Sequence, residues 1–235
     1  MFMKIVCFGD SLTRGVSVVK GRLRILKETY PKFLQDSFFK NKEDVTVVNK
    51  GVFNDNSELL LNRLEKDVIS ERPNYVIVEI GGNDCNFRWE EVSANPLDEH
   101  QPIVPLNLYL ENLKTIITNL QQNNITPIIA TLPPLDPVRY YKNISGRYSP
   151  SISHLISELG GIDHWQGLYN RQLNKVADEL NVLKVDVRTA IKKAGDLVDL
   201  ICEDGIHLTA AGYKAFGEEI YRNINLLNKG KVNLI

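Results

Sequence analysis

Five short runs rich in isoleucine and valine, separated by longer segments with helical periodicity, constrain the fold of this chain more than any other feature. The runs cover residues 4–8, 45–49, 75–80, 126–132 and 183–187. Each run is largely continuous in apolar residues, so each is expected to be a strand covered on both faces. Strands of that kind form a parallel sheet between two layers of helices.

The segments between the runs predict the helices of the two outer layers. Apolar residues recur at helical spacing within residues 31–40, 108–122 and about 163–180. Ser57 is placed to cap a helix that runs to residue 69, and Thr209 is placed to cap a last helix. Five strands that alternate with helices predict an α/β fold.

Two stretches interrupt the alternation, residues 85–107 and 133–161, and both are rich in proline, aromatic and charged residues. We expect a single domain over residues 1–235 in which both stretches are insertions over one rim of the sheet. Ligands of open α/β sheets bind beyond the carboxyl ends of the strands, so the insertions are candidate pocket walls. The alternative is that both are ordinary surface loops. Four of their aromatic side chains are candidate pocket residues: Phe87, Trp89, Tyr140 and Tyr141.

Charge and apolar patterning exclude several classes of function. Lys and Arg number 28 against 29 Asp and Glu, a net charge of -1, so no basic field favours nucleic acid. No apolar run approaches the roughly 18 residues that span a bilayer, and the apolar start is too short for an export signal. We therefore expect a cytoplasmic protein without membrane insertion. Its oligomeric state is not indicated. The three cysteines, Cys7, Cys85 and Cys202, fit no disulfide framework and are expected to be reduced and packed.

Residues with catalytic potential follow the first three predicted strands. Ser11, in the sequence Gly-Asp-Ser, would lie at a strand-to-helix turn on the carboxyl edge of the sheet. Gly51 follows the second strand and Asn83 the third. If these strands are neighbours, the Ser11 N–H, the Gly51 N–H and the Asn83 amide converge as an oxyanion hole for acyl transfer. Taken singly, each residue is also a common turn or capping residue.

A serine nucleophile needs a base, and His207 is the strongest of the four histidines. It lies in a polar loop before the last helix, three residues after Asp204. In a turn, this spacing lets Asp204 accept a hydrogen bond from Nδ1 and leaves Nε2 facing the nucleophile. The other histidines lie in or beside the two insertions, where exposed or substrate-facing roles are expected: His100, His154 and His164.

Four segments together resemble the motif blocks of the SGNH/GDSL hydrolase family. They are residues 9–12 (Gly-Asp-Ser-Leu), Gly51, residues 81–84 (Gly-Gly-Asn-Asp) and residues 204–209 (Asp-Gly-Ile-His-Leu-Thr). The blocks keep the family's order and reach across nearly the whole chain. The resemblance implies a flavodoxin-like three-layer α/β/α sandwich with a five-stranded parallel sheet. It also implies metal-independent hydrolysis of an ester or thioester through an acyl-enzyme, with a small-molecule ester as substrate and no cofactor.

The resemblance assigns the same roles to the residues already singled out. Ser11 is the nucleophile and an oxyanion donor, and Gly51 and Asn83 are further donors. His207 is the base and Asp204 its partner. The chain departs from the family at two positions: Asn54 replaces a frequent second glycine, and Gly82 replaces a frequent threonine. Asn tolerates left-handed backbone, so Asn54 is expected to keep the turn and alter the pocket wall.

Two other kinds of function remain open on the sequence. Sheets of this type also hold phosphorylated cofactors after the first strand, which makes a phosphate- or nucleotide-binding module the first alternative, although no glycine-rich phosphate motif is present. The second is a metal-dependent phosphoesterase, which retained activity in a chelator would exclude. Its candidate ligands are Asp10, Asp84, Asp204 and His207.

Overall fold

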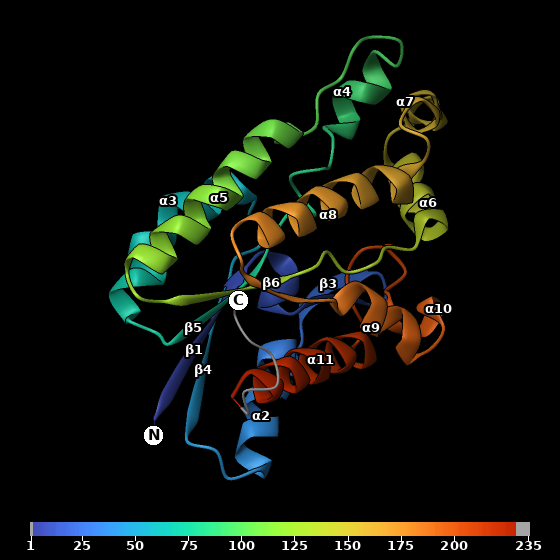
Figure 1. Cartoon of the computed structure of the whole chain (residues 1–235). Helices are drawn as coiled ribbons and strands as arrows, with labels where there is room; N and C mark the ends of the chain where they lie inside the picture. Colours follow the sequence, from blue (N-terminus) through green and yellow to red (C-terminus); the bar gives the residue numbers. More distant parts are fainter. Residues whose placement is uncertain (1, 229–235) are drawn as a thin grey trace.

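A five-stranded parallel sheet forms the centre of the molecule in the computed structural model, which describes residues 2–228 (Figure 1). The strands are ordered β4-β1-β5-β6-β7, and every neighbouring pair is parallel. The five predicted strands are therefore confirmed, with ends shifted by one or two residues. Their bounds are β1 Met3–Gly9, β4 Val45–Gly51, β5 Tyr75–Glu79, β6 Thr126–Ala130 and β7 Leu183–Val185.

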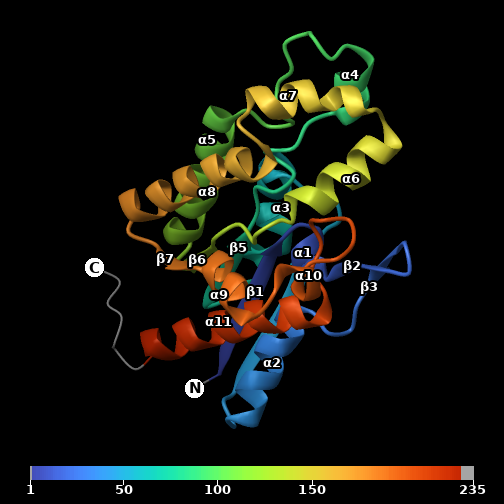
Figure 2. The same ribbon diagram turned by 90° about the vertical axis from the view of Figure 1, so that its right-hand side faces the viewer.

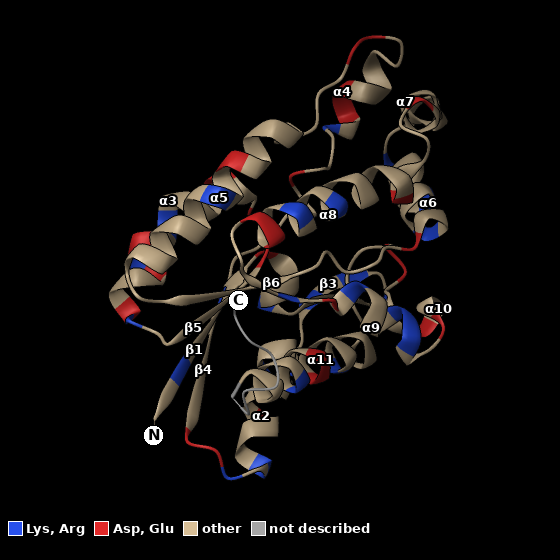
Figure 3. Cartoon of the chain, viewed as in Figure 1, with Lys and Arg blue, Asp and Glu red and all other residues tan. Residues whose placement is uncertain are grey.

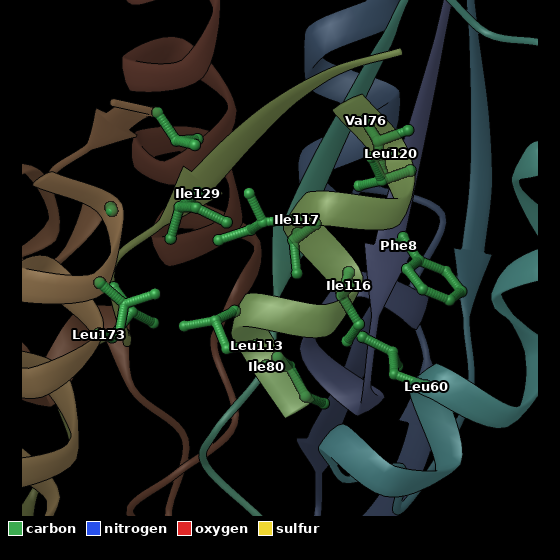
Figure 4. Close-up of a cluster of buried hydrophobic side chains, with 14 of the residues drawn as sticks. Phe8, Leu60, Val76, Ile80, Leu113, Ile116, Ile117, Leu120, Ile129 and Leu173 are labelled. Carbon is green, nitrogen blue, oxygen red and sulfur yellow. The ribbon is translucent and has the colours of Figure 1, made fainter. Parts of the chain in front are cut away.

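Helices cover both faces of this sheet, so the predicted three-layer α/β/α architecture is confirmed. Successive side chains of β1 point to opposite layers: Val6 and Phe8 enter one core, and Ile5 and Cys7 enter the other. Figure 4 shows the first core, where Phe8 and Leu60 lie beside the helix that carries Ile116. One layer holds α3 Ser57–Asp67, α5 Leu106–Gln122 and α8 Ile162–Glu179; the other holds α2 Tyr30–Lys40, α9 Val187–Ala194 and α11 Ala210–Asn228.

Side-chain caps set the starts of several helices. Thr209 Oγ1 accepts a hydrogen bond from the Gly212 N–H at 3.3 Å, as expected of a residue that caps the last helix. At α3 the prediction was one residue late, because Asn56, not Ser57, caps the helix by accepting from the Leu59 N–H at 3.0 Å.

The two predicted insertions are more helical than their composition indicated. Residues 85–107 contain α4 Trp89–Ala94; residues 133–161 contain α6 Pro137–Arg147, η2 Pro150–Ile152 and α7 Ser153–Glu158. Together they lie over the carboxyl ends of the strands (Figure 2), and we call them the cap. The two parts of the cap share a small apolar core of their own, formed by Phe87, Trp89, Val92, Tyr140, Ile144, Ile152 and Leu155.

A hairpin that the sequence analysis missed projects beside the sheet (Figure 2). Its antiparallel strands are β2 Val16–Val19 and β3 Arg22–Ile25. Lys20 and Gly21 both have positive φ, 52° and 70°, which is the backbone of a tight two-residue hairpin turn. The Gly21 N–H donates to Glu203 at 2.7 Å, so the tip of the hairpin contacts the loop that precedes α11. The remaining short elements are α1 Ser11–Arg14, η1 Ile69–Glu71 and α10 Leu197–Leu200.

Charges of both signs are interspersed along the outer helices (Figure 3), in keeping with the balanced composition. In the described part of the chain, no helix combines the length and apolarity that a bilayer crossing demands. The prediction of reduced, packed cysteines is confirmed: Cys7, Cys85 and Cys202 are buried and form no disulfide.

Candidate active site

Ser11 opens α1, directly after the central strand β1 ends. Asp10 caps this short helix, because its Oδ1 accepts a hydrogen bond from the Leu12 N–H at 2.8 Å. The turn therefore fixes the Ser11 side chain at the carboxyl edge of the sheet. Ser11 is only 8% exposed, so any group that reaches it must enter a cavity.

The structure brings the three predicted catalytic residues into one hydrogen-bonded chain. His207 Nε2 lies 3.1 Å from Ser11 Oγ, and His207 Nδ1 lies 2.6 Å from Asp204 Oδ2. The other carboxyl oxygen of Asp204 accepts from the backbone N–H groups of Ile206 and His207, at 3.2 and 3.1 Å. The same carboxylate thus shapes the turn and orients the imidazole.

The charge of Asp204 is stabilised by these contacts. Burial disfavours its ionised form, but hydrogen bonds from the His207 ring and the turn backbone outweigh burial and hold the pKa of Asp204 below its usual range. Asp204 is therefore an anion at neutral pH. An anion at this position favours the neutral imidazole tautomer with its proton on Nδ1, which leaves Nε2 free to accept a proton from Ser11.

A glycine lets this loop approach the cap. Gly205 has φ +83°, and a Cβ at this position would lie 2.3 Å from the backbone nitrogen of Tyr140. Any side chain would push the loop and α6 apart. The Asp204/His207 loop is thereby seated against the cap as well as against the sheet.

Asn83 lies at the cavity beside Ser11, as predicted for an oxyanion donor. Its Nδ2 donates to the backbone oxygen of Asp55 at 2.7 Å. An amide nitrogen carries two protons, so this contact orients the side chain and leaves one proton to donate elsewhere. The structure therefore keeps Asn83 available as a donor.

Gly51 is placed differently from the prediction. Its N–H donates to the Asn49 side chain at 2.8 Å, and Gly51 is not among the residues that line the cavity. A Cβ at this position would lie 2.1 Å from the backbone nitrogen of Arg14, so close packing against α1 explains the glycine. This structure does not present the Gly51 N–H to Ser11.

Asn54 also lies away from the cavity. Its φ of +62° confirms the left-handed backbone expected of it. Its side chain is exposed and does not line the cavity, so the expected effect on the pocket wall is not seen.

The cavity at Ser11 and His207 has a volume of about 80 Å³. Three of the predicted pocket residues line it, Phe87, Trp89 and Tyr140, whereas Tyr141 does not. The sequence analysis missed Trp165 of α8, because its spacing reads as an ordinary core position of that helix. The apolar wall includes Phe87, Trp89, Leu135, Tyr140, Trp165 and Ile206. A larger, open hollow at the amino ends of the strands contains none of the predicted catalytic residues.

Polar atoms in the wall satisfy one another. Trp89 Nε1 donates to Asn86 Oδ1 at 2.8 Å, and the Tyr140 hydroxyl donates to the same oxygen at 2.7 Å. These pairs leave mainly ring faces and aliphatic groups toward the cavity. The site is thus a small apolar pocket with the polar groups of Ser11, Asn83 and His207 at one end.

The other histidines have no contact with Ser11. His100 Nε2 lies 2.8 Å from the Asn95 carbonyl oxygen, and His154 and His164 are exposed. Residues 2–228 contain no group of three or more His, Cys, Asp or Glu side chains arranged to hold a metal ion.

Comparisons with known proteins agree on one family. Residues 7–215 match the model of the GDSL-like Lipase/Acylhydrolase family. The chain is 30% identical to GDSL esterase/lipase CPRD49 of Arabidopsis thaliana over 225 residues, 93% of this chain and 77% of that protein. Its fold matches the lipase/acylhydrolase from Enterococcus faecalis with a TM-score of 0.71 at 23% identity, over 100% and 99% of the two chains. It also matches a mutant of Axe2, an acetyl-xylooligosaccharide esterase from Geobacillus, with a TM-score of 0.67 at 22% identity over 94% of each.

Proposed function

The chain belongs to the GDSL-like lipase/acylhydrolase family and is a carboxylic ester hydrolase, and from this premise we propose that Ser11 is its nucleophile, His207 its base and Asp204 the partner of that base. The observation that carries the proposal is the buried chain of contacts from Asp204 through His207 to Ser11, at 2.6 and 3.1 Å. This arrangement meets the geometric requirement for activating a serine hydroxyl.

The reaction follows from the positions of these atoms. His207 Nε2 takes the proton of Ser11 as Oγ bonds to the carbonyl carbon of the ester, and the carbonyl oxygen becomes an oxyanion. The Ser11 N–H and the remaining amide proton of Asn83 donate to that oxyanion. His207 then protonates the leaving alcohol as its bond to carbon breaks, which leaves an acyl group on Ser11. Water attacks this ester with the same proton transfers and releases the acid.

A substrate panel with and without chelator tests the proposed function. We expect turnover of p-nitrophenyl acetate to survive the chelator, and p-nitrophenyl phosphate to remain uncleaved. Ser11→Ala is the blank. Loss of esterase activity in chelator, restored by a divalent ion, would instead support the metal-dependent alternative.

We assign the cap segments, residues 85–107 and 133–161, to the wall of the acyl pocket. A water molecule's share of liquid volume is about 30 Å³, so about 80 Å³ holds two or three groups of that size. That volume suits an acetyl or propionyl group. The acetyl group named for the Geobacillus neighbour agrees with this size.

The pocket size predicts acyl-chain selectivity. We expect kcat/KM for p-nitrophenyl acetate to exceed that for the hexanoate by about tenfold or more, because surplus methylenes must displace packed side chains. Trp89→Leu should raise the hexanoate-to-acetate ratio by about tenfold, since it removes part of the wall. The matched control is Tyr141→Leu, an aromatic residue on the cap that does not line the cavity. Equal ratios in the two variants would contradict the assignment.

The proposed role of Asn83 predicts a selective loss of turnover. Asn83→Ala should lower kcat by about 10²- to 10³-fold and change KM little, because a donor to the oxyanion acts mainly in the transition state. Asn56→Ala is the matched control: it removes the cap of α3, which lies outside the cavity, and should lower the melting temperature while kcat stays near normal. Near-normal kcat in folded Asn83→Ala would remove Asn83 from the site.

A further inference from the structure

Two buried carboxyl groups lie beneath the turn that carries Ser11. Asp10 follows the end of β1 and is 3% exposed; Glu79 ends the neighbouring strand β5 and is 1% exposed. β1 and β5 are neighbours in the sheet (Figure 1), and their register places Gly9 opposite Glu79. Neither carboxyl belongs to the Asp204/His207 pair, and the mechanism above uses neither.

Each of the two side chains accepts a hydrogen bond from the turn that carries Ser11. Asp10 Oδ1 accepts from the Leu12 N–H at 2.8 Å, and Glu79 Oε2 accepts from the Thr13 hydroxyl at 3.1 Å. The two carboxyl groups lie close enough together that each shifts the pKa of the other. An ionised carboxylate can only accept a hydrogen bond, so two carboxyl groups this close can share one only when one of them holds a proton.

No lysine or arginine of residues 2–228 offsets a second negative charge. Within residues 2–228, neither Asp10 nor Glu79 forms an ion pair with a lysine or arginine. Two ionised carboxylates in contact, both buried and without a cation, would repel each other strongly.

The geometry points to Asp10 and Glu79 as a pair that holds one shared proton while the enzyme works, with Glu79 as the donor and as a positioning residue for the Ser11 turn. The assignment rests on the proposed role of Ser11. We assign Glu79 as the donor because the Leu12 N–H can only donate, which favours the ionised form of Asp10, the residue that caps α1, whereas the Thr13 hydroxyl beside Glu79 can accept as well as donate. The proton on Glu79 then forms a hydrogen bond to the second carboxyl oxygen of Asp10.

The electrostatics of the site agree with this assignment. Burial raises the pKa of Asp10 to about 7, against the opposing effects of the Leu12 N–H and the His207 charge. Burial and the adjacent Asp10 raise the pKa of Glu79 well above its usual range. Both shifts favour a proton held between the two groups. Titratable groups on the surrounding elements also influence the charge of the pair. They are Tyr30 of α2, whose hydroxyl hydrogen-bonds to Thr13, Tyr109 of α5, Tyr213 of α11, Asp84 and His207.

Loss of the shared proton has a direct consequence for the nucleophile. When Glu79 ionises, it repels Asp10 and no longer donates a hydrogen bond to it. The hydrogen bond from the Leu12 N–H to Asp10 is then weakened. Ser11 lies between Asp10 and Leu12 in the chain. The wild-type enzyme should therefore lose activity at alkaline pH as Glu79 loses its proton.

Two substitutions of Glu79 separate positioning from packing. Glu79→Leu removes the donor and should lower kcat by about tenfold or more, with KM changed less. Glu79→Gln supplies a permanent N–H donor of the same shape and should restore most of that loss at pH 8. It should also abolish the alkaline decline, because the glutamine amide does not titrate. An identical alkaline decline in wild type and Glu79→Gln would overturn the proposal.

Infrared difference spectroscopy tests the proton itself without relying on Ser11. At pH 8 the wild type should show the band of a protonated buried carboxylic acid, and Glu79→Gln should lack it. Asp84→Asn is the matched control, since burial raises the pKa of Asp84 only to about 6 and its side chain should be ionised at pH 8. Absence of the band from folded wild-type protein would refute the shared proton, whatever the fate of the Ser11 assignment.

Discussion

Replacing Ser11 with alanine should lower kcat by about 10⁴- to 10⁶-fold while the protein stays folded. Within residues 2–228, the hydroxyl is the one hydrogen-bond partner of His207 Nε2, at 3.1 Å, so its removal takes away both the bond-forming atom and the proton that the base accepts. Ser11 is 8% exposed and small, and deletion of one oxygen leaves α1 and its Asp10 cap in place. Activity and thermal melting of the purified variant provide the measurement.

Covalent labelling with an organophosphonate probe also tests the role of Ser11. It should add one covalent label per chain to the wild type, and peptide mapping should place the label on Ser11. Ser17→Ala is a matched control, because Ser17 is also buried but contacts Cys202 outside the cavity. A label on another residue, or undiminished turnover in Ser11→Ala, would contradict the assignment.

Asp204→Asn should lower kcat by about 10⁴-fold and leave the fold intact. The amide oxygen of asparagine can still accept from the Ile206 and His207 N–H groups, so the turn is kept. The amide nitrogen would face His207 Nδ1, which is 2.6 Å from Asp204 Oδ2 in the native site. A donor at that place favours the imidazole tautomer with its proton on Nε2, and that tautomer cannot take the proton of Ser11.

The comparison for this variant is Asp186→Asn. Asp186 also caps a turn, accepting from the Thr189 N–H at the start of α9, but it does not line the cavity. We expect its kcat to stay near the wild-type value. If Asp204→Asn kept kcat within about tenfold of wild type, Asp204 would not be orienting the base.

The strands could be predicted from the sequence because burial on both faces leaves a clear trace. Runs such as residues 75–80 are almost entirely apolar, and the strand β5 lies within that run. The β2–β3 hairpin has no comparable signal in the sequence. Its turn is Lys20-Gly21, which lacks the Asn-Gly or Asp-Gly pair that usually marks a two-residue turn, and its strands are only four residues long.

The candidate site was likewise only partly predictable from the sequence. Ser11, His207 and Asp204 were identifiable because strand ends and the loop before the last helix converge on one edge of the sheet. The direction of a single N–H was not identifiable: Asn49 takes the hydrogen bond of Gly51, and no spacing rule reveals that competition. Tyr140 and Tyr141 look alike in the sequence, but consecutive residues on α6 point about 100° apart, so only Tyr140 lines the cavity.

The contact between Ser11 and His207 joins residues that are 196 positions apart. Ser11 follows the first strand of the sheet in chain order, and His207 is synthesised only after all five strands of the sheet. Contacts of such long sequence separation form late, because the entropy of closing the loop must be offset by structure already in place. A nascent chain can thus build most of its core and still carry an unactivated serine. If Ser11 and His207 act as proposed, hydrolysis requires the loop before α11 to be docked, so the appearance of activity during refolding should mark the completion of the fold.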